Sequence, residues 1–371
     1  MLSDINLHQF KRFKDESVEL YPLTLMTGIN GMGKSTVVQS LLLLRQSFDK
    51  GELQNNSKLV IEDKELVNLV SPDDMLCSDA DDKTVSIELV DDKKNAAKWV
   101  VVAEGKSNTL PYKYERNDGD IYSSSLFSEE FQYLNAERIG PRVTYDRLSV
   151  TKPHSPIGYR GEFVANRILE TVTNIEDVKL KDVLIEGVSA KVYDQLSAWV
   201  SEIIYPGTKV SIDDSDGSKI NLQYSFKDEQ TKTFNPLNIG FGFSFALPVI
   251  LAILTAKPGS LIVIENPEAH LHPRGQSRMG RLIALAVQSG VQILVETHSD
   301  HLLNGIRVAV KQGKLNCNKT HIHYFTADKV ELRDLKYKIS FAIEEDGGLE
   351  RWPTGFFDEW DKMLDELLKD K

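Results

Sequence analysis

The stretch from Gly28 to Thr36, GINGMGKST, constrains the fold of this chain more than any other segment. It follows an apolar run at residues 23–26 and precedes a longer one at residues 37–44, so the local order is strand, glycine-rich turn and helix. The turn matches the phosphate-loop pattern, in which Gly and four further residues lead into Gly-Lys-Ser. Glycines let successive backbone N–H groups point at phosphate oxygens, and the helix adds its positive N-terminal end. The segment therefore predicts a site for a nucleoside triphosphate.

The side chains of this loop fit defined parts of such a site. Lys34 can place its charge on the β- and γ-phosphates, and Ser35 can give its hydroxyl to Mg²⁺. The alternative, an ordinary glycine-rich turn, is disfavoured by the strand and helix patterns on its two sides. We predict ATP and Mg²⁺ as cofactors, with the nucleotide bound by these loop residues: Asn30, Gly31, Gly33, Lys34, Ser35 and Thr36.

Composition narrows the class of protein. The 371 residues suffice for two domains or for one domain with insertions, and no run of 18 apolar residues predicts a membrane span. The start of the chain has no basic region followed by an apolar stretch, and Cys77 lies far from Cys317, so a reduced, cytoplasmic setting is expected. A formal net charge of −11 argues against a protein that coats nucleic acid, although it leaves room for a local basic groove.

Hydrophobic periodicity divides the chain into segments of different kinds. Residues 49–83 are polar and acidic and predict a surface segment, whereas residues 160–205 have helical periodicity. From Gly240 onward helices and strands alternate, which is typical of an α/β unit. Strands are expected in four segments, of which the second and third form a hairpin: residues 1–27, 84–90, 98–102 and 210–226.

Two further apolar runs lead to residues suited to nucleotide chemistry. Residues 261–264 predict a buried strand, and Glu265 follows directly, where a carboxylate beside the phosphate loop can hold a Mg²⁺-bound water. Buried strands often end in Asp or Glu, so this pattern gains its meaning from the preceding phosphate loop. Residues 291–295 predict a second strand that closes on His298, which can sense or polarise the γ-phosphate. The alternative is a strand-end histidine whose ring is satisfied by backbone groups.

A glycine-rich segment lies between the phosphate loop and these strands. Gly240, Gly242 and Ser244 precede a long apolar helix. The serine is expected to cap this helix, and a capped N-terminus presents free N–H groups to an anion. Structurally the segment is a good helix start. Functionally it is similar to the signature segment of ABC-type ATPases, which closes over the γ-phosphate of a partner subunit.

Taken in order, these motifs resemble the ATPase heads of the SMC, RecF and overcoming-lysogenization-defect group of ABC-type proteins. Residues 265–273, ENPEAHLHP, are similar to the E-x-P-E-x-H-L-H-P element of stand-alone prokaryotic AAA-family ATPases in that group. Residues 348–360 resemble the C-terminal module of unknown function that some of them carry. The resemblance implies an α/β fold, namely a P-loop NTPase head of the ABC type with an N-terminal antiparallel sheet and a mixed α/β insertion.

Four regions are predicted on this basis. A first ATPase lobe with the phosphate loop and a β insertion covers residues 1–159, and a helical and β insertion covers residues 160–236. A second ATPase lobe with the signature, the second acidic motif and the switch histidine covers residues 237–335, and a C-terminal module covers residues 336–371. The central insertion carries no long heptad pattern, so a coiled-coil arm is not expected, and any nuclease activity would belong to a partner protein.

The resemblance also implies roles for matched positions. Ser35 and Glu265 would bind the metal, and His298 would take the switch position at the γ-phosphate. Three signature residues would act on the ATP bound by a second subunit: Gly240, Gly242 and Ser244.

The chain departs from the family pattern after the metal-motif acid. Many relatives carry a glutamate there to activate water, whereas this chain has Asn266. An amide can orient water but cannot accept its proton. Glu268 is the nearest replacement base, and ATP turnover is expected to be slow.

The predicted function is an ATPase that closes as a homodimer on Mg-ATP and so controls DNA or a partner effector. Phage defence and genome maintenance are roles that the resemblance alone implies. The alternative is a nucleotide-gated scaffold with negligible turnover, which Asn266 favours. A small-molecule P-loop kinase is a third hypothesis, against which the signature-like segment counts.

Two local clusters leave their roles open. The basic excess at residues 138–167 fits either contact with the phosphates of a nucleotide or nucleic acid, or a solvated, salt-bridged face. Within it Arg138 can reach the nucleotide site, and Gln132 nearby is a candidate metal-sensing glutamine. Core packing or an interface is predicted for the aromatic residues of the tail: Trp352, Phe356, Phe357 and Trp360.

Overall fold

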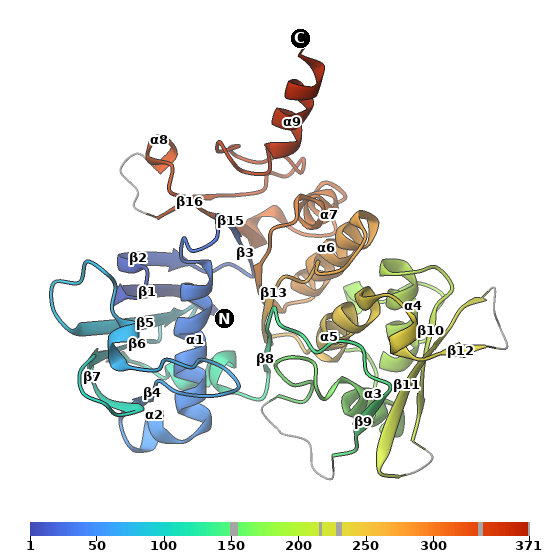
Figure 1. Ribbon diagram of the computed structural model, residues 1–371, viewed down its shortest axis with the longest axis horizontal. Coiled ribbons are helices and arrows are strands. Elements are labelled where there is room, and N and C mark those ends of the chain that lie inside the picture. The colour runs from blue at the N-terminus through green and yellow to red at the C-terminus, as the bar shows by residue number, and fades with distance from the viewer. Residues whose placement is uncertain (149–154, 215–216, 228–231, 333–336, 370–371) are drawn as a thin grey trace.

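A six-stranded mixed sheet lies at the centre of the structure. The structure is a computed structural model, and it describes residues 1–148, 155–214, 217–227, 232–332 and 337–369. In spatial order its strands are β16 (Lys338–Phe341), β15 (Thr320–Phe325), β3 (Leu23–Gly28), β14 (Gln292–Glu296), β13 (Leu261–Glu265) and β8 (Phe131–Leu134) (Figure 1). Strand β16 runs antiparallel to β15, and the other neighbours are parallel. The phosphate-loop strand, β3, therefore has a parallel partner on each side.

The parallel strands are apolar because both of their faces are buried. Val263 and Leu294 join the apolar cluster on one face, whereas Ile262 and Ile293 join the cluster on the other. Parallel strands need crossover connections. Helix α6 (Pro273–Gln288) links the neighbouring strands β13 and β14, and α7 (Asp300–Lys311) links β14 to β15, which lies on the other side of β3.

A second six-stranded sheet, antiparallel throughout, comes from the N-terminal part of the chain. The hairpin predicted around residues 84–102 is confirmed as two of its strands. Helix α1 (Lys34–Asp49) lies between this sheet and the central one, because its apolar side chains share one buried cluster with both (Figure 1). In spatial order the strands are β2 (Phe13–Glu19), β1 (Leu2–Phe10), β5 (Thr84–Asp91), β6 (Ala96–Val102), β7 (Thr109–Asp118) and β4 (Lys58–Val60).

The polar segment at residues 49–83 is more buried than its composition suggests. It forms α2 (Glu52–Asn55) and β4, and it carries Leu53, Leu59, Val67 and Met75 into the core. These apolar residues stand singly or in short runs, such as residues 59–61, between polar and acidic stretches, and they pack inward. The surface segment predicted from composition is therefore only partly right.

Helices cover the opposite face of the central sheet (Figure 1). The helical periodicity of residues 160–205 is confirmed as α3 (Val164–Thr173) and α4 (Val192–Ile203), and the α/β alternation from Gly240 onward begins with α5 (Phe241–Thr255). A four-stranded sheet packs beside these helices. Its strands are β9 (Thr144–Asp146), β10 (Lys209–Asp213), β11 (Lys219–Ser225) and β12 (Thr233–Phe234). Within the described ranges, no helix combines the length and apolar character needed to cross a bilayer.

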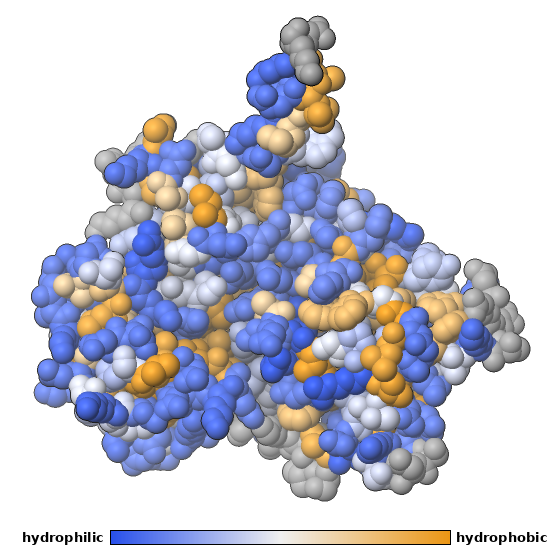
Figure 2. All heavy atoms as spheres, in the orientation of Figure 1, coloured by the Kyte–Doolittle hydropathy of each residue, from blue (hydrophilic) through white to orange (hydrophobic). Residues whose placement is uncertain are grey.

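The C-terminal part adds α8 (Lys329–Leu332) and α9 (Glu359–Leu368). Phe356 is buried and packs edge-on against Tyr324 and Phe341, with ring centroids 5.3 and 5.2 Å away. Core packing is thus confirmed for Phe356. Trp360 is 71% exposed on α9, which projects from the body, and Figure 2 shows apolar atoms uncovered along this projection.

His323 on β15 is fully enclosed and held as a neutral ring. Its Nε2 donates to the Glu19 carbonyl at 2.7 Å, and its Nδ1 accepts from Ser340 Oγ at 2.8 Å. Burial, helped by the charge of Lys338, lowers the pKa of His323 to about 3. Protonation would place an uncompensated charge in the core, so His323 stays neutral in the folded state at mildly acidic pH.

We therefore expect His323 to destabilise the fold as the pH falls. A histidine in the unfolded chain has a pKa of about 6.5. The contribution of His323 to the free energy of unfolding is therefore fully present above that pH. Below it the free energy of unfolding falls by about 1.4 kcal/mol per pH unit until the pKa of the folded state is reached. Between about pH 6.5 and pH 5 the loss amounts to roughly 2 kcal/mol. Denaturant unfolding should give a shallower pH slope for His323→Gln, whereas His301→Gln, at a half-exposed position, should keep the wild-type slope. Equal slopes in His323→Gln and wild type would contradict this expectation.

Candidate functional site

The phosphate loop joins the end of β3 to the start of α1. Gly28 has φ +122° and Gly33 has φ +117°, values that side-chain-bearing residues rarely adopt. A Cβ on Gly28 would overlap the Phe325 carbonyl of β15, and a Cβ on Gly33 would overlap the Phe13 ring. Conformation and space therefore both require glycine at these two positions, which fixes the turn from strand into helix.

A cavity of about 290 Å³ opens over this loop. Lys34 is almost fully buried beside it, and its Nζ donates to the carbonyls of Gly28 at 2.9 Å and Ile29 at 3.0 Å. Burial lowers the pKa of Lys34, and the charge of Glu296 opposes that shift. An ammonium held by neutral carbonyls can turn toward an incoming anion. The structure thus brings all six predicted loop residues to one cavity, whose lining is Asn30, Gly31, Gly33, Lys34, Ser35, Thr36 and Glu296.

Glu296 is the lining residue that the sequence motifs did not single out. It ends β14, where the register pairs it with Met26 of β3 and Glu265 of β13. Ser35 Oγ donates to its Oε2 at 3.1 Å. Burial raises the pKa of Glu296 to about 7, with Glu265 adding to the rise and Lys34 opposing it. An acid at the end of an apolar run is the signal that points to Glu265, and the same signal at residues 291–296 would have found Glu296.

The carboxylate of Glu265 is tied to β8 and the segment that follows it. Its Oε1 accepts from Tyr133 Oη at 3.0 Å, and its Oε2 accepts from the Ala136 backbone N–H at 3.2 Å. Arg138 donates to the backbone carbonyls of Glu265 at 2.8 Å and Asn266 at 2.9 Å. Burial raises the pKa of Glu265, while these hydrogen bonds and the charge of Arg138 lower it. Glu265 is thus held firmly beside Glu296, which makes the contact with the loop.

Glu268 and His298 are in direct contact. The His298 backbone N–H donates to Glu268 Oε1 at 2.8 Å, and Glu268 Oε2 is buried without a hydrogen-bond partner in the part of the chain that the structure describes. Burial raises the pKa of Glu268, and burial together with the charge of Lys34 lowers the pKa of His298. Asn266 has φ +46°, and its Oδ1 is likewise buried with no partner among the described residues. Buried polar atoms of this kind call for an explanation such as a bound water or ligand.

The three signature residues lie outside this cavity. Helix α5 begins at Phe241 with Gly240 as its N-terminal flanking residue, and Ser244 is buried inside the helix. The predicted serine cap is therefore wrong, because the helix begins earlier than the glycine pattern suggests and its first turn includes Gly242. A Cβ on Gly242 would come within 2.8 Å of the His270 carbonyl, so glycine is needed there for close packing.

The basic excess at residues 138–167 resolves into separate ion pairs. Arg147 pairs with Asp214 at 3.0 Å, Arg160 with Glu137 at 2.6 Å, and Arg167 with Glu176 at 2.8 Å. Lys152 lies outside the described residues. These contacts favour the interpretation as a solvated, salt-bridged face, with Arg138 as the member that reaches the acidic motif.

Gln132 does not line the cavity over the phosphate loop. It is buried, and its Nε2 donates to the carbonyls of Tyr133 at 2.7 Å and Gly158 at 3.3 Å. Contacts with residues of β8 and of the segment after it hold its amide nitrogen, and they give no support to a role in sensing the metal.

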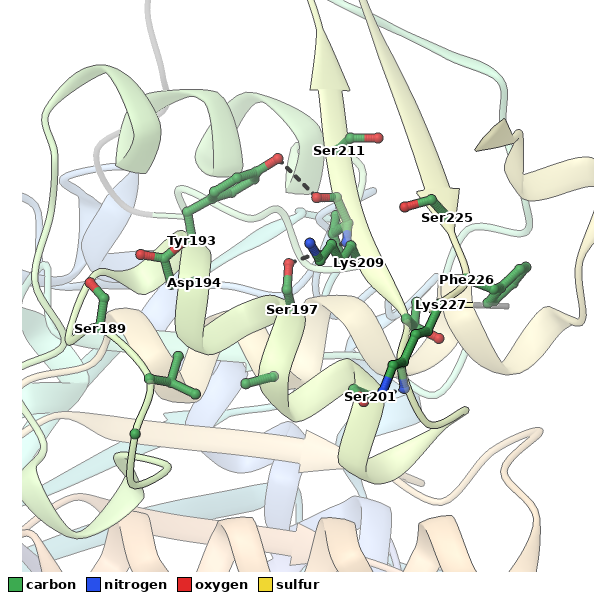
Figure 3. A pocket seen from close by; sticks show the side chains of 16 residues that line it. Ser189, Tyr193, Asp194, Ser197, Ser201, Lys209, Ser211, Ser225, Phe226 and Lys227 are labelled. Atoms are coloured by element: carbon green, nitrogen blue, oxygen red, sulfur yellow. Dashed lines mark hydrogen bonds between the residues drawn. The ribbon is translucent and has the colours of Figure 1, made fainter. Parts of the chain in front are cut away.

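A larger groove, of about 1130 Å³, lies between α4 and β10 and contains none of these residues. Figure 3 shows Tyr193 of α4 reaching the strand, where its Oη donates to the Val210 carbonyl at 2.8 Å. Ser197 Oγ accepts from the Val210 N–H at 3.2 Å. The two side chains thus form hydrogen bonds with the backbone N–H and carbonyl of Val210 at the outer edge of β10. A further strand could pair with β10 at this residue only by displacing them.

The oxygen donors at the loop fit Mg²⁺ that arrives with a nucleotide. Ser35 supplies a hydroxyl and Glu296 a carboxylate, and Mg²⁺ in such sites takes one or two carboxylates and completes its shell with phosphates and water. Over the described residues, no group of three or more His, Cys, Asp and Glu is arranged to hold a metal without such help.

Comparisons with known proteins place this geometry in context. Residues 23–304 match the family described as "AAA domain, putative AbiEii toxin, Type IV TA system". Residues 315–367 match a protein family of unknown function, DUF3696. No curated protein matches the chain.

Solved structures of Smc heads are similar in fold. A crystal structure of an Smc head bound to the C-winged helix domain of ScpA has a TM-score of 0.54 and 11% identity, and the match covers 93% of this chain and 99% of that one. An Smc head with an extended coiled coil, bound to the C-terminal domain of ScpA derived from Pyrococcus furiosus, has a TM-score of 0.53 and 11% identity, with 99% of each chain covered. The expected α/β architecture of a P-loop NTPase head is thus confirmed.

Proposed function

The chain belongs to the AbiEii-type AAA domain family, and from that premise we propose that it hydrolyses ATP and closes as a head-to-tail homodimer on Mg-ATP to control DNA or a partner effector. It carries a P-loop ATPase domain of the SMC and AbiEii type, followed by a C-terminal module of unknown function. The observation that carries the proposal is the cavity over the phosphate loop, where Lys34, Ser35 and Glu296 converge.

Lys34 and Ser35 line the cavity, and Asn266, Glu268 and His298 lie outside its lining; each has a part in the proposed reaction. Bound Mg²⁺ would neutralise charge on the β- and γ-phosphates. Lys34 would hold the same phosphates, and Ser35 would hold the metal together with the carboxylates at the ends of β13 and β14. Glu268, with one free buried oxygen, is the base for the attacking water, and Asn266 orients that water. His298, kept neutral by burial and by Lys34, can accept or donate a hydrogen bond at the γ-phosphate.

The dimer is proposed because the signature residues are absent from the cavity of their own subunit. Gly240 is exposed at the start of α5, and a Cβ built on it meets nothing within 4 Å. Phe241 beside it is 54% exposed, as is Ile29 of the phosphate loop at 52%. A second subunit that laid its α5 N-terminus on the loop would cover both apolar side chains and bring helix N–H groups to the γ-phosphate.

What the opening and closing of the dimer would control is proposed from the similar proteins. The two Smc heads are seen with domains of ScpA, which supports a partner protein that senses opening and closing. The family description names a toxin of a type IV toxin–antitoxin system, which is compatible with a role in phage defence. Genome maintenance is the other proposed setting, with DNA as the controlled molecule.

Gly240→Arg tests the dimer directly. The position has open space and ordinary backbone angles, φ −62° and ψ 148°, so the chain should fold, while the long side chain blocks an approaching subunit. We expect this variant to bind a fluorescent ATP analogue like wild type, to stay monomeric with Mg-ATP in sedimentation, and to lose turnover by about 100-fold or more. Ser189→Arg, at an exposed site on the α4 groove, is the control and should behave as wild type.

The same assay separates the candidate functions. Turnover that duplex DNA stimulates supports control of DNA, and turnover indifferent to DNA supports a protein partner. Assembly that ignores ATP, with negligible turnover, supports the scaffold that Asn266 favours. A dimeric, active Gly240→Arg would contradict the proposed geometry.

A further inference from the structure

The metal ligands of the site can be assigned from the order of strands in the central sheet. Strand β14 lies between β3 and β13, so the end of β14 is one strand nearer to the phosphate loop than the end of β13. Glu296 and Glu265 are the last residues of these two strands and are paired in register. The carboxylate nearest to the loop is therefore the one on β14.

The contacts of the two carboxylates agree with this order: Glu296 contacts the phosphate loop, and Glu265 contacts β8 and the segment after it. Glu296 lines the cavity and accepts from Ser35 Oγ at 3.1 Å and 3.3 Å through its two oxygens. Glu265 does not line the cavity, and its oxygens are taken by Tyr133 and Ala136.

Glu296 also lacks the cation that a buried carboxylate needs. It is 8% exposed, and no ion pair of the described residues includes it. The charge of Lys34 acts on Glu296, but the Lys34 ammonium donates its hydrogen bonds to the carbonyls of Gly28 and Ile29. A buried carboxylate with no cation in contact is costly, and a divalent ion would compensate its charge. The carboxylate and the adjacent hydroxyl are oxygen ligands of the kind that Mg²⁺ prefers, and they make up part of its coordination shell.

We propose that Glu296 is the carboxylate that binds the nucleotide's Mg²⁺ together with Ser35, directly or through one water, and that Glu265 is a positioning residue behind it. This assignment rests on the proposed function, since the phosphates of ATP must supply further ligands. Tyr133, Ala136 and Arg138 fix Glu265, and Glu265 in turn places a second negative charge next to Glu296 and the metal.

The test compares Glu296→Gln with Glu265→Gln in the full chain, using Mn²⁺ as the metal probe and ADP as the nucleotide. Electron paramagnetic resonance of free Mn²⁺ gives the metal affinity of the ADP complex, and fluorescence of a labelled ADP in EDTA gives nucleotide affinity without metal. We expect Glu296→Gln to weaken Mn²⁺ by at least about tenfold while ADP binding in EDTA is kept. Glu265→Gln should weaken Mn²⁺ less than Glu296→Gln does, because its carboxylate acts on the metal only through Glu296.

A second variant distinguishes the loss of a metal ligand from the loss of the folded state. Glu296→Asp keeps the charge but shortens the reach, and it should bind Mn²⁺ more weakly than wild type and more tightly than Glu296→Gln. Unchanged Mn²⁺ affinity in Glu296→Gln, or a larger loss in Glu265→Gln, would overturn the assignment while leaving the ATPase proposal intact. Wild type that binds neither ADP nor Mn-ADP would overturn both.

Discussion

Replacing Lys34 with alanine is expected to weaken ATP binding by about 100-fold and to abolish turnover. A hydrogen bond to a charged group contributes about 1.5–3 kcal/mol, so losing the ammonium's bonds to two phosphates corresponds to roughly that factor. The loss leaves phosphate next to Glu296 with no cationic side chain in the lining. Equilibrium binding of a fluorescent ATP analogue and steady-state phosphate release are the measurements.

The fold should survive this substitution. Among the described residues, the Lys34 ammonium donates to the Gly28 and Ile29 carbonyls alone. Lys34 itself lines the cavity, so water that takes the place of its ammonium can bind these carbonyls instead. Lys64→Ala, at an exposed position, is the control and should match wild type in binding and turnover. Nucleotide affinity of Lys34→Ala within about threefold of wild type would remove the basis for placing ATP at this loop.

Glu268→Gln should leave ATP bound but unhydrolysed. A general base contributes about 10²- to 10⁴-fold, and the amide keeps the shape and the acceptor for the His298 N–H while it cannot take a proton. We expect turnover to fall by at least about 100-fold and the ATP-bound dimer to accumulate. Sedimentation with Mg-ATP and phosphate release measure the two effects.

A matched glutamate controls for the loss of charge. Glu345→Gln changes an exposed carboxylate and should leave turnover as in wild type. Normal turnover in Glu268→Gln would exclude Glu268 as the base. Undetectable turnover in wild type and variant alike would instead favour the nucleotide-gated scaffold.

Local sequence signals predicted the parts of the site that one short segment can build. The phosphate loop, its strand and its helix follow from the spacing of glycines and apolar residues, and the structure has them as β3 and α1. The α/β alternation after Gly240 follows in the same way. These elements are determined by neighbours along the chain, so propensity and periodicity suffice.

The rest depends on which strands become neighbours in space. Glu296 acquires its importance because β14 inserts between β3 and β13, an order that periodicity does not encode. The burial of residues 49–83 likewise depends on the antiparallel sheet that covers them. The helix starts at Phe241, earlier than the glycine and serine pattern predicts, and Gly242 in its first turn lies close to the His270 carbonyl.

Asn266 shows how one position can carry two demands. Its backbone has φ +46°, a left-handed conformation that Asn tolerates better than Glu. Its buried Oδ1 has no partner within the described residues. Asn266, in place of the glutamate that the resemblance implies, therefore suits the local backbone as well as the proposed role of Glu268 as the base.

Strand β3 has a consequence for the entropy of nucleotide binding. Parallel ladders on both sides hold it, and Gly28 at its end is pressed against the Phe325 carbonyl of β15. The floor of the phosphate loop is therefore ordered before any ligand arrives. Its conformational freedom, roughly 1–2 kcal/mol for each backbone residue fixed, is lost when the chain folds and not when ATP binds. Affinity is gained in this way without a single additional contact to the nucleotide.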